Sequence, residues 1–360
     1  MQMRKMAGMT GMAVAAIVCL AVGMAQADIT IDTVRVGNAN NTGELSGAGA
    51  GGYGTDRICG AVAYEYNIGK YEVTAGQYAA FLNAKAKTDT YGLYNASMDS
   101  SGYGCQITRL GSSGNFYYDF SGRPSGTTEA DWANRPVNYV SWYDTIRFAN
   151  WMTNGQGDGK TESGSYTITG GGANSGTVTI PTATDRATWS TGETSYFLLT
   201  SEDEWYKAAY YDKNAVLAAT YFDYPTSSNT VPSNDLVEPT DPGNNATFYD
   251  GGYTIGSPYY RTEVGAHENS DSPYGTFDQG GNVWEWNEAL ISGSSRGLRG
   301  GSFNNNDDIL RASYRYDGIN PAGESYVIGF RVSEVPEPAS MAVLALGSIG
   351  MLLRRRKLGR

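Results

Sequence analysis

The stretch that most constrains the fold is Tyr274–Glu288, which reads YGTFDQGGNVWEWNE. Trp284 and Trp286 occupy alternate positions, so in an extended segment both indoles lie on one side of the strand. We expect this side to anchor a hydrophobic core. Val283 and Glu285 then point to the opposite side, which we expect to be free for chemistry.

The same stretch places two carboxylates around a tight turn. Asp278 and Glu285 flank Gly280 and Gly281, and main-chain carbonyls lie between them. Calcium takes hard oxygen ligands of these two kinds from protein loops. The pattern favours a structural calcium site. The alternative is that Asp278 begins a turn and that Glu285 pairs with a nearby arginine.

Three helices are predicted from capping residues and apolar periodicity, beginning after Thr74, Ser141 and Ser201. Ser141 with Asp144, and Ser201 with Glu204, have the spacing of a capping box. Strands are predicted at 29–36, 66–73 and 196–199, with a hairpin at 166–169 and 177–180. Long loops are predicted at 88–132 and 212–274, where Tyr, Gly, Ser, Asn and Pro are frequent.

Several blocks resemble one known family in their order along the chain. These blocks are YNIGKYEVTAGQYAAFLN from Tyr66, RPVNYVSWYD from Arg135, LLTSEDEWYKAA from Leu198, GGNVWEW from Gly280, RGGSF from Arg299 and GFRV from Gly329. They are similar to the formylglycine-generating enzyme, or sulfatase-modifying factor, domain family, from about Tyr64 to Glu334. The resemblance implies an α+β, C-type-lectin-like fold that is loop-rich, with short strands and a few helices.

The resemblance also implies ligands for calcium. Asp278 and Glu285 would supply side-chain oxygens, and Gly281 and Val283 would supply main-chain carbonyls. Asn245 and Ala246 lie where the family places a second calcium site.

The chemistry of this family is oxidation of a cysteine in a protein substrate by a cysteine pair that binds copper after Gly-Gly-Ser. Here no cysteine occurs between Gly301 and Arg360, and Asn305 stands where the first is expected. An amide cannot form the thiolate that Cu(I) prefers. We therefore expect no copper and no carry-over of that activity. Ser302, Asn305, Arg311 and Trp284 become candidate binding residues.

His267 is the only histidine, which excludes a two-histidine iron site and a histidine-rich zinc site. It lies in a predicted loop, where we expect a solvated side chain. Arg299, Arg311, Arg315 and Arg331 are expected to pair with core carboxylates or, alternatively, to line the pocket that receives peptide in the family.

Both ends of the chain carry targeting features. Residues 1–27 combine Arg4 and Lys5, an apolar run and Ala-Gln-Ala, which is typical of a secretory signal peptide. Residues 335–360 carry VPEP, a short apolar run and a basic cluster from Arg354, and they resemble the PEP-CTERM sorting signal. That signal implies a processing protease and transient association with the membrane. An ordinary C-terminal anchor helix is the alternative. Between these ends we expect an N-terminal strand and Gly-rich loop at 28–63 and the main domain at 64–334.

The formal net charge is −11, and both ends are basic, so the central part is more acidic still. An acidic surface argues against a nucleic-acid partner. Cys59 and Cys105 remain after the signal peptide, either as a disulfide or as two buried thiols.

These features predict an exported cell-envelope protein that binds calcium and presents loops 88–132 and 212–260 to a peptide or glycan without catalysis. The alternative is an oxidoreductase related to formylglycine-generating enzyme that acts on protein substrates. A purely structural role in an extracellular matrix is a third possibility.

Overall fold

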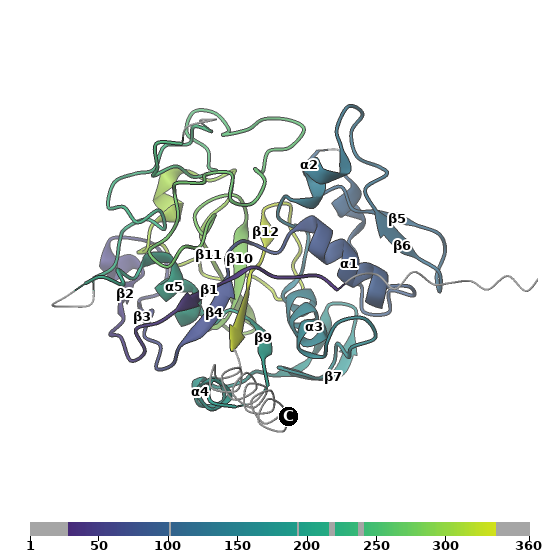
Figure 1. Ribbon diagram of the computed structural model, residues 1–360, viewed down its shortest axis with the longest axis horizontal. Helices are drawn as coiled ribbons and strands as arrows, with labels where there is room; N and C mark the ends of the chain where they lie inside the picture. The colour runs from purple at the N-terminus through teal and green to yellow at the C-terminus, as the bar shows by residue number, and fades with distance from the viewer. Residues whose placement is uncertain (1–27, 101, 193, 216–219, 237–240, 336–360) are drawn as a thin grey trace, which may run out of the picture.

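The computed structural model describes residues 28–100, 102–192, 194–215, 220–236 and 241–335. These residues form a mixed α+β, loop-rich fold, as predicted (Figure 1). The α-helices are α1 (Ala75–Lys85), α2 (Glu129–Ala133), α3 (Trp142–Thr153), α4 (Ala183–Trp189) and α5 (Glu202–Tyr210). The strands are β1 (Thr33–Val36), β2 (Glu44–Ser46), β3 (Arg57–Cys59), β4 (Tyr66–Gly69), β5 (Thr108–Leu110), β6 (Tyr117–Asp119), β7 (Thr167–Gly172), β8 (Ser175–Thr179), β9 (Tyr196–Leu199), β10 (Trp284–Ser292), β11 (Ser295–Arg299), β12 (Ile328–Gly329) and β13 (Val332–Val335).

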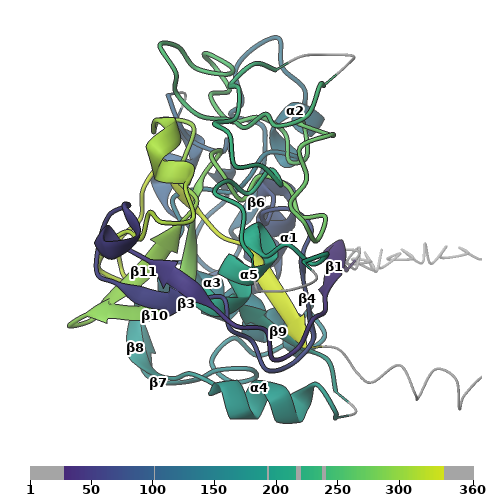
Figure 2. The ribbon, with the colours of Figure 1, turned by 90° about the vertical axis from the view of Figure 1, so that its left-hand side faces the viewer.

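Two sheets organise the molecule. In the first, the order β1-β4-β13-β9 places β4 between β1, near the start of the described chain, and β13, at its end, and every pairing is antiparallel. In the second, β10 pairs with β11 in a hairpin and with β12 in parallel. Figure 2 shows this hairpin at one edge of the molecule, with β7 and β8 below it. Segments far apart in sequence therefore meet in both sheets, and the long loops extend from them.

Local capping explains where the helices begin. Thr74, Ser141 and Ser201 each accept a hydrogen bond from the backbone three residues on, and each capping box is complete. The three predicted helices are confirmed. The short helices α2 and α4, which we did not predict, begin with the same device at Thr128 and Thr182.

The predicted loops are only partly irregular. Residues 88–132 contain β5, β6, α2 and a short 3₁₀ helix at Ala96–Asp99, because brief turns and caps order them locally. Within 212–274, the described residues form no helix or strand beyond isolated bridges, as predicted. Figure 1 shows this green segment arching over one end of the molecule, near α2.

Strand β10 is buried on both faces at its start. Trp286 is fully buried and donates its Nε1 proton to the carbonyl of Val140 at 2.9 Å, and Trp284 is 7% exposed. Glu285, on the opposite face, is also fully buried. The expectation that this face would be free for chemistry is wrong, because α5 and the GFRV segment pack against it through Trp205 and Arg331.

Buried ion pairs connect the two sheets to α5. Glu202 pairs with Arg299 and Arg315, each at 2.8 Å, and Arg331 pairs with Glu285 at 2.6 Å. The expected pairing of these arginines with core carboxylates is confirmed. Arg311 also has an acidic neighbour, Asp308 at 3.5 Å, but at the surface. No helix among the described residues is long and apolar enough to cross a membrane.

Replacing Glu202 by Gln is expected to lower the free energy of unfolding by about 3–5 kcal/mol, because two buried guanidinium groups lose their counter-charge. Urea denaturation measures this loss. The matched control is Glu65→Gln, which breaks the exposed pair with Arg35 and should cost less than about 1 kcal/mol. Equal losses in the two variants would contradict the assigned role of the buried pair.

Candidate functional site: a tyrosine-lined face beside the Gly-Gly-Ser turn

The candidate site is built on the turn that comes after β11. Gly300 and Gly301 have φ values of 95° and 75°, which glycine adopts without strain. A Cβ atom on Gly300 would stand 2.5 Å from the carbonyl oxygen of Gln279, so the turn lies directly against the segment before β10. Gly281 donates its N–H to the carbonyl of Gly300 at 2.9 Å. The two most distinctive motifs of the sequence therefore meet here.

Ser302 and Asn305 form a closed polar turn. The side-chain oxygen of Asn305 accepts hydrogen bonds from the Ser302 hydroxyl at 2.8 Å and from the Ser302 N–H at 3.0 Å. Cys59 and Cys105 are buried free thiols in separate hydrophobic clusters, so the disulfide alternative is wrong. The hydroxyl and amide at this turn do not fit a Cu(I) site, because Cu(I) prefers soft thiolate ligands.

Beside this turn lies a group of six aromatic side chains, here called the tyrosine cluster. Its members come from four separate segments: Tyr103, Tyr249, Tyr253, Tyr260, Phe303 and Tyr326. Phe303 is buried at its base, with the ring of Tyr260 centred 5.8 Å away, and Tyr253 is 37% exposed at its rim. The predicted loops 88–132 and 212–260 thus meet at one face. The sequence alone predicted these loops as a surface but did not single out any of the six residues as a binding residue.

Asn304 links the phenol groups of the tyrosine cluster. Its side-chain oxygen accepts a hydrogen bond from the Tyr253 hydroxyl at 3.2 Å, and its amide nitrogen donates to the Tyr326 hydroxyl at 3.3 Å. Desolvation and the neighbouring phenols raise the pKa of Tyr103 above its ordinary value. The Tyr103 hydroxyl therefore stays protonated and can donate a hydrogen bond to a ligand.

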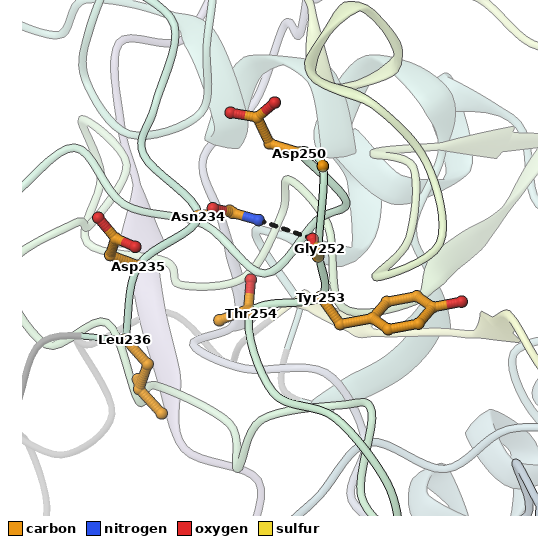
Figure 3. A pocket seen from close by; sticks show the side chains of 8 residues that line it. Asn234, Asp235, Leu236, Asp250, Gly252, Tyr253 and Thr254 are labelled. Atoms are coloured by element: carbon orange, nitrogen blue, oxygen red, sulfur yellow. Dashed lines mark hydrogen bonds between the residues drawn. The ribbon is translucent and has the colours of Figure 1, made fainter.

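An open pocket of about 710 Å³ adjoins the cluster at Tyr253 (Figure 3). Asn234 donates its side-chain N–H to the carbonyl of Gly252 at 3.0 Å, which joins the two loops that form the walls. Asp235 and Asp250 carry the pocket's carboxylates. A concave surface with acceptors and an aromatic ring at its edge is the kind of site that binds a polar ligand.

The residues predicted to bind calcium lie around two different features. Asn245, Ala246 and Asp278 line one small cavity of about 10 Å³ together with His267. Oδ2 of Asp278 accepts a hydrogen bond from the N–H of Gly265 at 2.6 Å, and burial raises the pKa of Asp278 to about 6. Amide and carboxylate oxygens at this cavity are of the type that calcium prefers.

Glu285 lies on the other side of this segment. Both of its carboxylate oxygens are engaged, by Nε and Nη2 of Arg331 at 2.6 and 2.7 Å and by Nε1 of Trp205 at 2.7 Å. Within the part of the chain that the structure describes, no three His, Cys, Asp or Glu side chains are placed to hold a metal ion. A calcium ion at the small cavity would depend on the Asp278 carboxylate together with amide and main-chain oxygens, for which Gly281 and Val283 are the predicted carbonyl donors. This calcium site remains a prediction.

Two candidate binding residues lie apart from the tyrosine cluster. Trp284 packs against Tyr316, with ring centroids 5.2 Å apart. Arg311 lies over the ring of Tyr224, with Cζ 5.5 Å from its centroid. The clustered tyrosines were signalled only by the abundance of tyrosine, 27 residues, and not by any local motif.

The fold and the candidate site define the class of this protein as a loop-rich α+β domain followed by a sorting segment. Residues 59–335 match the model of the sulfatase-modifying factor enzyme 1-like domain, and the chain belongs to that family. Residues 334–357 match the PEP-CTERM protein-sorting motif, which indicates export and sorting to the surface. Both resemblances inferred from sequence are confirmed. The C-type-lectin-like description and the signal peptide at 1–27, which lies outside the described residues, remain predictions.

Solved structures with similar folds include variable protein 1 of Treponema denticola, at 20% identity and a TM-score of 0.49, covering 84% of this chain and 95% of that one. Another is PvdO from Pseudomonas aeruginosa, at 14% identity and a TM-score of 0.43, covering 84% and 93%. CarF is similar at 19% identity and a TM-score of 0.43, covering 84% and 98%. No curated protein matches the sequence.

His267 is buried, so the expectation of a solvated side chain is wrong: loops of the 212–274 segment close over it. Its Nε2 lies 3.0 Å from the Thr247 hydroxyl, and Nδ1 is buried without a hydrogen-bond partner in the described structure. Burial lowers the pKa of His267 to about 4, partly opposed by Asp241.

Because the folded pKa of His267 lies below that of the unfolded chain, unfolding takes up a proton between about pH 6.5 and 4. Stability is therefore expected to fall as the pH falls through this window, by at most about 1.4 kcal/mol per pH unit from this group. Denaturation at pH 7 and pH 5 measures the loss, and His267→Gln should reduce it. Parallel pH profiles for the two proteins would contradict this assignment.

Proposed function

We propose that this protein is an exported, non-catalytic module of the cell envelope that binds a peptide or glycan through the tyrosine cluster and is stabilised by calcium. The observation that carries the proposal is the convergence of the tyrosine cluster beside a Gly-Gly-Ser turn that lacks thiols. Tyrosine supplies a large, rigid contact area with a hydroxyl for hydrogen bonding, at low cost in side-chain entropy. Such a surface suits recognition better than redox chemistry.

The alternative is an oxidoreductase that modifies protein cysteines. Against it stands the chemistry of the turn, since Ser302 and Asn305 satisfy each other and both described thiols lie elsewhere. Incubation of the protein with copper, oxygen and a cysteine-bearing peptide tests the alternative directly. We expect the peptide mass to stay unchanged, and a mass consistent with formylglycine would overturn the non-catalytic proposal.

The sorting motif supplies the rest of the proposal. We expect a sorting protease to recognise the C-terminal segment and remove it after transient membrane association, which leaves the domain in the envelope. An acidic chain suits this setting and disfavours nucleic acid.

Aromatic truncation tests the binding face. Tyr253→Ala and Tyr103→Ala are each expected to weaken the ligand selected from a glycan or peptide array about tenfold, because each loses on the order of 1.4 kcal/mol of contact. Tyr117→Ala is the matched control, since Tyr117 is 52% exposed in β6 and is not a member of the tyrosine cluster. Equal affinity of all three variants for the ligand would show that the ligand binds outside the tyrosine cluster.

Calcium is expected to raise the melting temperature of chelated protein, because the loops at the small cavity have few regular backbone hydrogen bonds of their own. Scanning calorimetry with and without the ion measures the shift. Asp278→Asn should diminish the shift, whereas Asp158→Asn, an exposed control, should leave it unchanged. Identical melting of the chelated and calcium-loaded wild-type protein would remove calcium from the proposal.

A further inference from the structure

Buried arginines in this protein fall into two groups. Seven arginine side chains are buried among the described residues. Five of them pair with carboxylates at 2.6–2.8 Å: Arg147, Arg186, Arg299, Arg315 and Arg331. Arg135 and Arg261 form no such pair with any described residue. A buried charge without a counter-charge is costly to fold, so these two need a separate explanation.

Arg135 is 5% exposed and lines a pocket of about 440 Å³. Its Nη1 donates to the carbonyl of Arg261, and its Cζ lies 4.1 Å from the centroid of the Tyr259 ring. Its Nε is buried and has no hydrogen-bond partner in the described structure. The guanidinium of Arg135 is therefore only partly satisfied by the described residues, and Arg135 lines the pocket.

Arg261 lies behind Arg135 and is fully buried. Its Nη1 and Nη2 donate to the carbonyls of Tyr103 and Gly104 at 2.8 and 3.0 Å. Burial lowers the pKa of Arg261 to about 10, and the adjacent charge of Arg135 contributes to that fall. Arg135 thus lines the pocket, whereas Arg261 contacts Tyr103 and Phe303 of the tyrosine cluster. An anion in the pocket would offset the charge of Arg135 and reduce its effect on Arg261.

We infer that the pocket over Arg135 binds the carboxylate of an acidic sugar residue, a uronic acid. The planar fork of arginine matches a carboxylate in two parallel hydrogen bonds. A volume of about 440 Å³ accommodates one sugar ring. This inference rests on the proposed function, and within it selects glycan over peptide.

Glu263 explains the choice of sugar over an acidic peptide. Glu263 lines the same pocket, and its negative charge favours the charged form of Arg135. Among the described residues, however, these two side chains form no ion pair. A uronic acid carries hydroxyls beside its carboxylate, so Arg135 takes the carboxylate while Glu263 accepts from a hydroxyl. The aspartate or glutamate side chain of an acidic peptide has no hydroxyl beside its carboxylate, so it offers Glu263 no donor to offset the repulsion that both ligands experience. Asp131, the other acid near Arg135, accepts hydrogen bonds from Thr128 within its capping box.

The pocket is also contiguous with the proposed binding face. Leu236 lines the larger pocket beside Tyr253 (Figure 3) and also this one. The adjacent residues Thr254 and Ile255 each line one of the two pockets. Tyr259 under Arg135 is followed directly by Tyr260 of the tyrosine cluster. One glycan chain can therefore reach both the arginine and the tyrosines.

The test is calorimetric titration of the full-length protein with oligogalacturonate, the matched neutral galactose oligomer and a poly-glutamate peptide. We expect oligogalacturonate to bind at least tenfold more tightly than the neutral oligomer. Arg135→Gln should abolish that preference, and Arg135→Lys should restore little of it, because an ammonium lacks the fork. Glu263→Gln, which keeps an acceptor and removes a negative charge, should bind as tightly or more tightly. Arg35→Gln is the exposed control and should bind as the wild type does.

A stability measurement guards against misfolding of the variants. In the absence of ligand, Arg135→Met should melt at or above the wild-type temperature, because it removes a buried charge that has no ion-pair partner, whereas Arg299→Met should melt lower. Oligogalacturonate should raise the melting temperature of the wild type but not that of Arg135→Met. A large loss of stability in Arg135→Met without ligand would overturn the inference.

The outcomes separate the two proposals. Neutral glycan binding that depends on Tyr253, with no preference for oligogalacturonate, overturns the Arg135 site and leaves the binding face in place. Tight binding of poly-glutamate alone overturns the sugar assignment. No binding of any glycan overturns both.

Discussion

The rest of the structure depends most on the buried ion pairs that Glu202 forms with Arg299 and Arg315. Glu202 lies in the first turn of α5, where the helix dipole favours a negative charge, and it joins Arg299 at the end of β11 to Arg315 further along the chain. Burial alone raises the pKa of Glu202, but the arginines outweigh it and lower the pKa to about 2. Because Arg299 immediately precedes the Gly-Gly-Ser turn, this pair also determines where the candidate site begins.

The Gly-Gly-Ser turn is fixed by its backbone contacts. Two glycines allow the chain to pass close to the segment before β10, and this close contact does not depend on the residues after Gly301. With Asn305 in the next turn, the position holds a hydrogen-bonded amide in place of a sulfur ligand. Phe303 and Asn304 then become the base and the polar link of an aromatic face. In the function proposed above, this backbone geometry supports recognition.

Charge is distributed unevenly through the interior. Around β10 and α5, carboxylates and guanidinium groups are matched, and both oxygens of Glu285 are held by charge-assisted hydrogen bonds from Arg331. The loops over the other side hold Arg135 and Arg261 without described carboxylate partners and His267 with an unpaired nitrogen. The matched charges stabilise the scaffold. Unmatched buried groups occur in it too, such as Lys207 in α5 and Asn287 in β10, but Arg135 differs from these two in lining a pocket of about 440 Å³.

The sequence alone determined the structural features that depend on contacts between residues a few positions apart. The caps at Thr74, Ser141 and Ser201 form within three residues, so their helices were predictable, as were the tryptophans of β10 and the family to which the ordered motifs belong. Only the tertiary structure decided that Glu285 is buried on the second face of β10, that His267 is enclosed, and that Cys59 and Cys105 lie apart. It also decided that Tyr103 meets Tyr260 and Tyr326, more than 150 residues away. The reason is physical: no local pattern encodes such contacts, because they arise when separate loops are brought together by the pairing of distant strands and by buried ion pairs.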